Sequence, residues 1–354
     1  MSSQQNPKLK IDVVGATGAV GVEILRCLEG SQISPSRIRL FASPRSAGRK
    51  VEFRSGHGED VQTLIVEAMD EDDWLNESEP ADLVFLAAGG DSSRRLGRRM
   101  AARGPIVIDN SSAFRMDDDV PLIIPEINGS ALKSEEHHLI ANPNCSTIVA
   151  LMALAPLHSR FGLESYVAST YQAVSGAGQQ GLDELMAQTR AQLAGESTEP
   201  SADAVFARPI AFNVLPFIGS GGFGEDTDEE LKMRRESQKI LGVSGLDVSC
   251  TAVRVPVLRA HAVSIVAHFH SACDVEEAVG TLSAAAGVRV QQDCDAAEIW
   301  TPQDADGGDD VLVTRLRTVP GTQPRLALFA IGDQLRKGAA LNAVQIAEAV
   351  FCAR

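Results

Sequence analysis

The sequence predicts a two-domain α/β protein. Three observations lead to this fold class: a length of 354 residues, a strand–glycine turn–helix pattern near the start, and short apolar runs that alternate with helical segments. The length exceeds the roughly 250–300 residues that one hydrophobic core usually serves. We therefore expect two compact domains, with neither an internal repeat nor a low-complexity linker between them.

The composition favours small-molecule chemistry in the cytoplasm. A formal net charge of −15, with no basic stripe to offset it, argues against nucleic-acid and anionic-membrane partners. No run approaches the roughly 18 apolar residues of a membrane span, and the first ten residues lack the apolar core of a signal peptide. The cysteines show no CxxC pair, so we expect reduced thiols and no bound metal. They are Cys27, Cys145, Cys250, Cys273, Cys294 and Cys352.

The segment KIDVVGATGAVGVEILRCLEG, residues 10–30, predicts a buried strand, a turn and an amphipathic helix that ends at Gly30. Gly15, Gly18 and Gly21 permit a tight turn, the approach of a pyrophosphate to the backbone, and close helix–strand packing. This GxxGxxG spacing varies the usual dinucleotide fingerprint, and an ordinary strand-to-helix turn is the alternative. We expect cofactor contacts at Gly15, Ala16, Thr17, Gly18, Ala19, Val20 and Gly21.

The segment RIRLFASPRSAGRK, residues 37–50, predicts the second strand and the type of cofactor. It lacks the acidic residue that an NAD site would place at the end of this strand. Ser43, Arg45 and Ser46 instead offer two hydroxyls and a guanidinium to a 2′-phosphate, beside Arg49 and Lys50. We therefore expect NADP, with a solvated basic loop as the alternative.

Further buried strands are predicted in DLVFLAAGG, residues 82–90, and PIVIDNSSAFRM, residues 105–116. Continuous apolar strands that alternate with helices imply a mostly parallel, Rossmann-like sheet covered on both faces. Residues 137–145 then lead into the second domain. Exposed loops are expected between Gln188 and Asp203 and at 301–310.

The stretch IANPNCSTIVAL, residues 140–151, places a thiol at the start of a helix. Pro143 disfavours helix at the residue before it, so the helical run begins near Cys145. A thiol at a helix N-terminus has a lowered pKa, because unpaired amides and the helix dipole stabilise the thiolate. We expect Cys145 to be a nucleophile, whereas a small buried residue is the usual state of the other cysteines.

A thiolate beside a nicotinamide cofactor can attack an activated carbonyl, and hydride then passes to or from that carbon. This chemistry needs a proton donor and acceptor. His261 is the candidate, because it lies in VRVPVLRAHAVS near Arg254 and Arg259, which would anchor anions. Arg254 and His261 are seven residues apart, so the chain must bend near Pro256 if both serve one site. A surface histidine is the alternative.

Eight motifs together resemble the aspartate-semialdehyde dehydrogenase family, in order and over nearly the whole chain. They are GATGAVG, ASPRSAG, IDNSSAFRM, NPNCST, STYQAVSGAG, EELKM, RVPVLRAH and GDQLRKGAALNAVQIAE. The resemblance implies reversible, NADP-dependent reductive dephosphorylation of L-aspartyl 4-phosphate to L-aspartate 4-semialdehyde. That step leads toward diaminopimelate and lysine, threonine and methionine. The resemblance also implies a homodimer, or a tetramer of such dimers.

By this resemblance, Cys145 matches the nucleophile and His261 the acid/base residue. Gln172 matches the residue that orients the acyl intermediate; a strand-end hydrogen bond is its alternative role. Arg254 matches the clamp on the substrate α-carboxylate, for which a planar guanidinium suits. Arg115 matches the phosphate-binding arginine, at the carboxyl edge of the sheet where ligands of such folds bind.

The resemblance also assigns Glu229 to the substrate ammonium and Lys232 to the phosphate. The sequence alone favours an ordinary ion pair between these residues, which are three apart on a helix. We further expect Asn144 to contact the substrate. Three residues are expected to contact the cofactor: Ser175, Gly176 and Gln334.

The C-terminal helix, from Ala339, resembles a segment that returns to the cofactor domain. The expected domains are therefore 1–144 with 338–354, which binds NADP, and 145–337, an α+β domain for catalysis and dimerisation. PFIGSGGFGED, residues 216–226, departs from the family pattern. Two alternatives stay open: an N-acetyl-γ-glutamyl-phosphate reductase, against which Glu229 argues, and an inactive NADP-binding paralogue.

Overall fold

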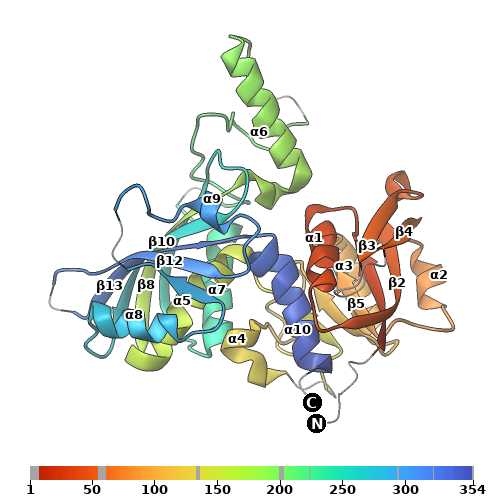
Figure 1. The fold of residues 1–354 in the computed structure, drawn as a ribbon, viewed down its shortest axis with the longest axis horizontal. Helices are drawn as coiled ribbons and strands as arrows, with labels where there is room; N and C mark the ends of the chain where they lie inside the picture. The colour runs from red at the N-terminus through yellow and green to blue at the C-terminus, as the bar shows by residue number, and fades with distance from the viewer. Residues whose placement is uncertain are drawn as a thin grey trace. The chain divides into compact units, whose positions relative to one another are not determined.

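The computed structural model describes residues 8–54, 61–132, 136–198, 203–222, 224–292, 295–321 and 323–352 (Figure 1). Contacts between Cα atoms divide the chain into two compact units. The first unit is Met1–Pro143 with Ala339–Arg354, and the second unit is Asn144–Gly338. Among the described residues, no helix combines the length and apolar character that crossing a membrane would need.

The first unit is built on a seven-stranded sheet in the order β3-β4-β2-β1-β5-β6-β7. All neighbouring pairs in this sheet are parallel except β3 with β4. The bounds are β1 Lys8–Val14, β2 Ser34–Ala42, β3 Lys50–Arg54, β4 Val61–Ala68, β5 Leu83–Leu86, β6 Ile106–Asp109 and β7 Leu139–Ala141. Every residue of β5, β6 and β7 is buried, as expected of parallel strands covered on both faces.

Helices of the first unit are α1 Ala19–Glu29, α2 Glu71–Leu75, α3 Gly90–Ala101, α4 Pro125–Asn128 and α10 Leu341–Phe351. α10, the last helix of the chain, packs against α1, and both share one apolar core with β1. Ile11 of β1, Ile24 of α1 and Val344 of α10 are all buried in it. The first core is thus completed by residues from both ends of the sequence. The predicted Rossmann-like, mostly parallel sheet is confirmed.

The turn between β1 and α1 depends on glycine at two positions. Gly15 has φ +90°, and a Cβ built on it would lie 2.3 Å from the carbonyl oxygen of Ala87. A Cβ on Gly21 would lie 2.3 Å from the carbonyl oxygen of Gly15. Both neighbours are backbone atoms, so neither can move aside without displacing a strand or the turn. The helix can therefore approach the strand only because side chains are missing here.

The second unit contains a six-stranded sheet in the order β11-β12-β13-β10-β8-β9. Its strands are β8 Leu163–Gln172, β9 Asp247–Arg254, β10 His261–Phe269, β11 Val288–Val290, β12 Val311–Thr318 and β13 Arg325–Gly332. Its helices are α5 Cys145–Phe161, α6 Gly178–Leu193, α7 Asp228–Leu241, α8 Val275–Ser283 and α9 Pro302–Ala305. Only the pairs β11–β12 and β8–β9 are parallel, which agrees with the predicted α+β arrangement.

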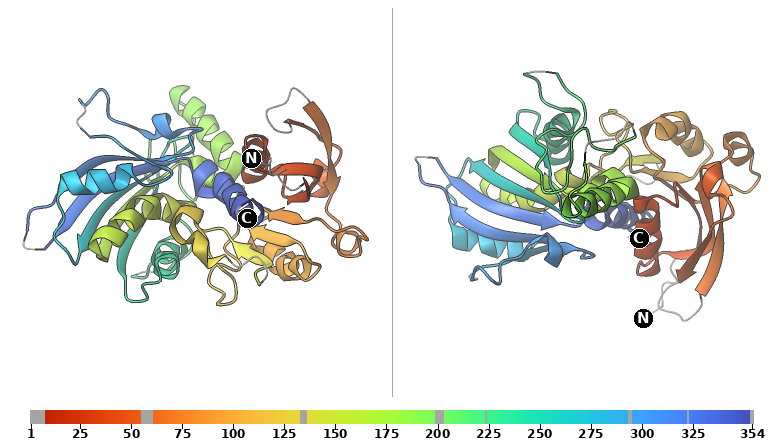
Figure 2. Two further views of the ribbon diagram at one scale, coloured as in Figure 1. Left: turned by 60° about the horizontal axis from the view of Figure 1, so that its bottom comes forward. Right: turned by 90° about the horizontal axis from the view of Figure 1, so that it is seen from above.

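Three helices of the second unit, α5, α7 and α8, pack on the strands and on one another along one face of this sheet (Figure 2). α5 is buried almost all round because it lies between the sheet and the two other helices. The opposite face carries apolar side chains that the described residues leave exposed: along β8, Val167 is 52% and Tyr171 40% exposed. Tyr171 of β8 and Phe329 of β13, the two strands on either side of β10, form a ring pair.

Several predicted boundaries differ from the structure. The expected loop at 301–310 contains the short helix α9, because Thr301 and Asp304 form a capping box at its start. The region expected to be an excursion after Gln188 stays helical to Leu193, and residues 199–202 lie outside the described residues. The C-terminal helix begins with a π-helical turn, Arg336–Ala340, before α10. Of the glycine-rich segment 216–226, residue 223 is not described.

We predict that Gly21→Ala lowers the free energy of unfolding by about 2 kcal/mol, the usual cost of overpacking a tight contact. Gly30→Ala is the matched control, because a Cβ there meets nothing within 4 Å and φ is −98°. Urea unfolding monitored by circular dichroism measures both variants. Equal stability of the two variants would show that the α1–β1 contact is looser than described.

Candidate active site

Cys145 is the first residue of α5, and the residue before it provides the N-cap. Asn144 has an extended backbone, and its side-chain oxygen accepts hydrogen bonds from the backbone N–H groups of Ser146, at 3.0 Å, and Thr147, at 3.3 Å. The cap satisfies amides that the helix leaves unpaired. The half-buried thiol therefore lies in the first turn, where the helix dipole favours negative charge.

The ends of three strands bring the other candidates of the second unit together. β8 lies between β9, to which it is parallel, and β10, to which it is antiparallel. On the β9 side, Gln172 pairs with Arg254. On the other side, Tyr171 pairs with Ala262, the neighbour of His261. The carboxyl ends of β8 and β9 and the amino end of β10 thus meet at one edge of the sheet. The seven-residue spacing of Arg254 and His261 required a bend in the chain. The connection from residue 255 to residue 260 provides this bend.

Glu229, near the start of α7, joins the cap of α5 to β8. Its Oε1 accepts hydrogen bonds from Asn144 Nδ2, at 2.9 Å, and from Gln172 Nε2, at 3.2 Å. Its Oε2 accepts from Lys232 Nζ at 3.0 Å, and Gln172 also donates to Ser146 Oγ at 2.7 Å. Burial opposes ionisation of Glu229, but Lys232 and the two amide donors outweigh it and hold the pKa of this carboxyl below its usual value.

Arg254 and His261 are both anchored on the backbone of Ala173. Arg254 Nη1 donates to the carbonyl oxygen at 2.7 Å, and the backbone N–H donates to His261 Nδ1 at 3.0 Å. Burial lowers the pKa of Arg254, and the charges of Cys145 and Glu229 oppose that effect. The guanidinium is thus a buried cation within a cluster of anions.

The hydrogen bond from Ala173 determines the tautomer of His261. Because Nδ1 accepts, the proton of the neutral ring lies on Nε2. Nε2 is buried and has no hydrogen-bond partner among the described residues. Burial, together with the charge of Arg254, lowers the pKa of His261 to about 3, although Glu229 acts in the opposite direction. The geometry therefore offers a neutral Nε2–H hydrogen-bond donor, and the acid/base role that the family resemblance implies stays a prediction.

Arg259 does not serve the anion site that the sequence suggested. Its Nε donates to Asp333 at 2.7 Å and lies 3.3 Å from Asp306, so two carboxylates already neutralise it. Asp333 is fully buried and also accepts from the backbone of Leu335. The arginine therefore ties the segment before His261 to the end of β13.

The residues predicted to contact the cofactor in this unit line the same region. A Cβ on Gly176 would lie 2.8 Å from Arg254 Nη1 and 3.2 Å from His261 Nε2, so only glycine leaves that space open. Gln334 accepts from the backbone N–H of Ala260 at 2.8 Å and donates to Ser175 Oγ. Ala260 has φ +69°, an uncommon conformation for a residue with a side chain, and the amide of Gln334 helps to hold it.

The first unit has its own cavity, of about 390 Å³, at the carboxyl edge of β1, β2 and β5. Gly15, Thr17 and Gly18 line it together with Ser43. Thr17 Oγ1 donates to Ser46 Oγ at 3.3 Å, which links the glycine turn to the exposed segment that follows β2. Arg45 is exposed in that segment. These residues fit a dinucleotide, because the turn exposes backbone where a Cβ would intrude.

The two charged residues of this cavity were not predicted from the sequence. Glu71 and Arg95 lie in its wall and form an ion pair at 2.9 Å. Arg99 also approaches Glu71, at 3.6 Å, so the carboxylate is neutralised on two sides. The only local signal was the repeated arginine of α3, which the sequence by itself relates to no site. By contrast, the predicted Ala16 is fully buried, and Ala19, Val20 and Gly21 belong to the first turn of α1.

Arg115 belongs to the first unit, in the loop after β6. It is 7% exposed, and its Nε donates to the carbonyl oxygen of Asn142 at 2.9 Å. Its Nη2 donates to the carbonyl oxygen of Asn110 at 3.2 Å. Two backbone oxygens therefore hold the guanidinium on the side of Asn110 and Asn142.

Comparisons with known proteins agree with this architecture. A family model described as "Semialdehyde dehydrogenase, NAD binding domain" matches residues 10–135, and one described as "Semialdehyde dehydrogenase, dimerisation domain" matches 154–337. The aspartate-semialdehyde dehydrogenase of Streptomyces akiyoshiensis is 43% identical over 97% of this chain and 98% of its own length. The chain belongs to the aspartate-semialdehyde dehydrogenase family. The family resemblance predicted from the eight motifs is thereby confirmed.

Other members of the aspartate-semialdehyde dehydrogenase family show the same extent of similarity. The Bacillus subtilis protein is 40% identical over 97% of each chain. Among solved structures, aspartate semialdehyde dehydrogenase II of Vibrio cholerae, complexed with ASA, superposes with a TM-score of 0.89. Its sequence is 36% identical, over 97% of this chain and 98% of that chain. The fold of both units is thus a family property.

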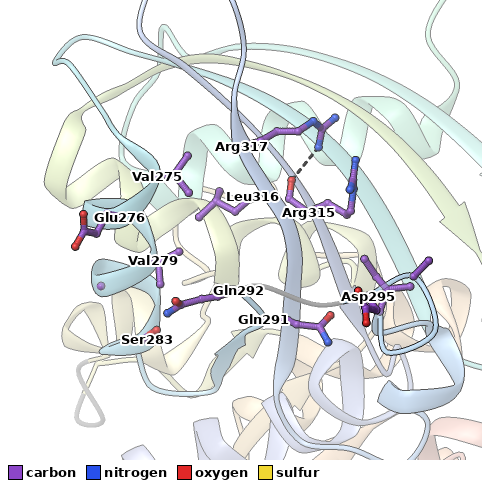
Figure 3. A pocket seen from close by; sticks show the side chains of 13 residues that line it. Val275, Glu276, Val279, Ser283, Gln291, Gln292, Asp295, Arg315, Leu316 and Arg317 are labelled. Atoms are coloured by element: carbon purple, nitrogen blue, oxygen red, sulfur yellow. Dashed lines mark hydrogen bonds between the residues drawn. The ribbon is translucent and has the colours of Figure 1, made fainter.

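A larger cavity, of about 1050 Å³, lies elsewhere in the second unit (Figure 3). α8 forms one wall with Val275 and Val279, and β12 forms another with Arg315 and Arg317. None of the residues that line it belongs to the cluster around Cys145. Both arginines are exposed, and Arg317 donates to the carbonyl oxygen of Arg315 at 2.8 Å. Size alone therefore does not locate the chemistry in this family member.

We predict that His261 stays neutral, with the proton on Nε2, from pH 5 to pH 8. The reason is its pKa of about 3, which burial beside Arg254 imposes. Nitrogen NMR of protein labelled at the histidine rings measures the protonation of each ring nitrogen, and His261→Gln identifies the signal. A titration of this ring near pH 6.5, or a proton on Nδ1, would contradict the assignment.

Proposed function

We propose that the chain catalyses NADPH-dependent reductive dephosphorylation of L-aspartyl 4-phosphate to L-aspartate 4-semialdehyde, through a thioester on Cys145. The observation that carries the proposal is the convergence of Cys145, Gln172, Glu229, Arg254 and His261 at one edge of the second unit. Relatives about 40% identical over nearly their full length carry the name of this enzyme. A cysteine pattern without a CxxC pair and an acidic composition suit the cytoplasm, where we place the reaction.

We assign the two units different tasks. The first unit binds NADP through the turn from Gly15 to Gly21 and through Ser43, Arg45 and Ser46. The second unit carries out the chemistry and contributes Ser175, Gly176 and Gln334 to the cofactor. When bound, NADPH supplies the hydride that reduces the acyl carbon. The residues of the chain bind, orient and stabilise charge around that carbon.

In the first step the Cys145 thiolate attacks the carbonyl carbon of the acyl phosphate. A C–S bond forms, and the carbonyl electrons move onto oxygen. When the adduct collapses, the C–O bond to phosphate breaks, phosphate leaves with the electron pair, and a thioester remains. His261 offers its Nε2–H to the oxygen that gains negative charge, because Nδ1 is occupied by the Ala173 amide. The one proton that the overall reaction consumes goes to the departing phosphate.

After reduction the same donor stabilises a second tetrahedral oxyanion. This adduct collapses directly to the aldehyde and the Cys145 thiolate, which breaks the C–S bond and restores the nucleophile. Neither collapse requires a base at His261. A neutral Nε2–H donor is therefore sufficient for both steps, and Gln172, tied to Ser146 of the first turn of α5, orients the acyl group.

Charged residues recognise the two ends of the substrate. Arg254 binds the α-carboxylate, for which a planar guanidinium provides parallel hydrogen bonds. Glu229, whose carboxylate is ionised and 11% exposed, binds the ammonium. Lys232 and Arg115 bind the phosphate. An N-acetylated substrate has no ammonium for Glu229, so it would lose this ion pair and place a neutral acetyl group against a carboxylate that is only 11% exposed.

We also propose a homodimer, or a tetramer of such dimers, built on the open face of the second sheet. Val167 and Tyr171 present apolar area there, and the family model that covers this region is described as a dimerisation domain. Analytical ultracentrifugation of the wild type and of Val167→Glu tests the proposal. A wild type that sediments as a monomer at micromolar concentration would refute it.

We predict that the purified protein reduces NADP rapidly with L-aspartate 4-semialdehyde and phosphate, and not with N-acetylglutamate semialdehyde. The charge pair of Glu229 and Arg254 is the reason for this selectivity. Absorbance of NADPH in the reverse direction measures both reactions side by side, with a phosphate-free reaction as the control. A protein that is folded, binds NADP and turns over neither substrate would support the inactive paralogue.

Cys145→Ala should abolish turnover, by at least about 10⁴-fold, while NADP binding survives, because the nucleophile and the cavity of the first unit are separate parts of the chain. Cofactor titration by fluorescence measures the second property. Retained turnover would refute the covalent route, and lost cofactor binding would show that the variant is damaged more widely.

A further inference from the structure

Glu236 is a buried carboxylate that touches the residue before the nucleophile. It lies on α7, is 1% exposed, and its Oε2 accepts a hydrogen bond from the backbone N–H of Asn144 at 2.6 Å. Burying a carboxylate is costly unless hydrogen bonds compensate. An apolar side chain would fill this place in a helix core at lower cost, so the contact with Asn144 needs an explanation.

The same helix holds Asn144 at a second point. Glu229 accepts from Asn144 Nδ2 at 2.9 Å, while Glu236 accepts from the backbone nitrogen. The two glutamates are seven residues apart, so they lie on one face of α7, two turns from each other. Helix α7 therefore accepts hydrogen bonds from both the main chain and the side chain of Asn144, the N-cap of α5.

These bonds leave Asn144 committed to the protein. Its side-chain oxygen accepts from Ser146 and Thr147, and its side-chain nitrogen donates to Glu229. The expected role of Asn144 as a substrate contact stays a prediction, because an amide nitrogen carries two N–H groups and the bond to Glu229 uses one of them. The position of Asn144 directly before Cys145 also suits a different task.

We propose that Glu236 is a positioning residue for Cys145, and that α7 sets the distance between the nucleophile and the ammonium site at Glu229. The inference rests on the proposed function, because Glu229 is the substrate contact in that proposal. Glu236 fixes the peptide that leads into α5, and the cap then fixes the first turn. Attack on a bound carbonyl is sensitive to such placement, since a shift of about 1 Å can cost about 100-fold in rate.

Two substitutions separate the reach of the side chain from its charge. Glu236→Gln keeps the length and one oxygen acceptor, whereas Glu236→Asp keeps the charge and withdraws the carboxylate by one methylene. Glu230→Gln is the matched control on the same helix. The Glu230 carboxylate accepts from the backbone N–H groups of Thr227, at 2.7 Å, and Ala252, at 3.0 Å, so it also caps main-chain groups, away from Asn144.

We predict that Glu236→Asp lowers kcat of the reverse reaction by at least about 30-fold, with KM for L-aspartate 4-semialdehyde within about threefold of wild type. Glu236→Gln should stay within about fivefold in kcat, and Glu230→Gln within about threefold. Alkylation of Cys145 by iodoacetamide, followed at its peptide by mass spectrometry, should slow in Glu236→Asp alone. Thermal unfolding confirms that each variant is folded.

Two results would overturn the proposal: unchanged kcat and alkylation in Glu236→Asp, or equal losses in Glu236→Asp and Glu230→Gln, which would indicate general weakening of α7. The alkylation rate does not depend on the substrate. If the wild type failed to use L-aspartate 4-semialdehyde, the proposed function would fall, and the alkylation comparison would still decide the role of Glu236.

Discussion

The backbone of one buried residue, Ala173, determines the electrostatics of the candidate site. Its N–H holds His261 in the tautomer that donates from Nε2, and its carbonyl holds the Arg254 guanidinium. Ala173 lies directly after β8, between the ends of β9 and β10, so its position follows from the strand order of the second sheet. A change in that order would separate the cation from the imidazole, and the chemistry depends on their meeting.

The second constraint is the balance of buried charge around the start of α5. Glu229 and Glu236 are hydrogen-bond acceptors on one helix, while Lys232, Arg254 and the amide groups of the α5 cap supply donors and positive charge. Each carboxylate is stabilised by donors that also define the shape of the nucleophile turn. Buried charges are costly when a partner is missing, so this cluster tolerates little rearrangement and keeps Cys145 in one orientation.

In the first unit, the glycine turn has to leave backbone N–H groups accessible to a cofactor phosphate while the apolar core stays covered. Gly15 and Gly21 remove the side chains that would separate α1 from the sheet, and α10 seals the other side of α1 with residues from the end of the chain. Glu71 in the wall of the cavity is neutralised by Arg95 and Arg99, so a cavity with a carboxylate in its wall can still accept an anionic ligand.

The sequence by itself determined the features that depend on neighbours along the chain. Strand periodicity, the glycine turn and the helix that starts at Cys145 are local, and eight motifs in order identified the family. Only the tertiary structure decided which polar groups are already paired. Arg259 is neutralised by Asp333, 74 residues away, and Asn144 is held by Glu236, 92 residues away. His261 Nδ1 accepts a hydrogen bond from the backbone N–H of Ala173, 88 residues away. Hydrogen bonds between residues so far apart in the chain produce no periodic pattern in the sequence. They depend on how strands and helices pack, and the spatial order of these elements cannot be read from the sequence.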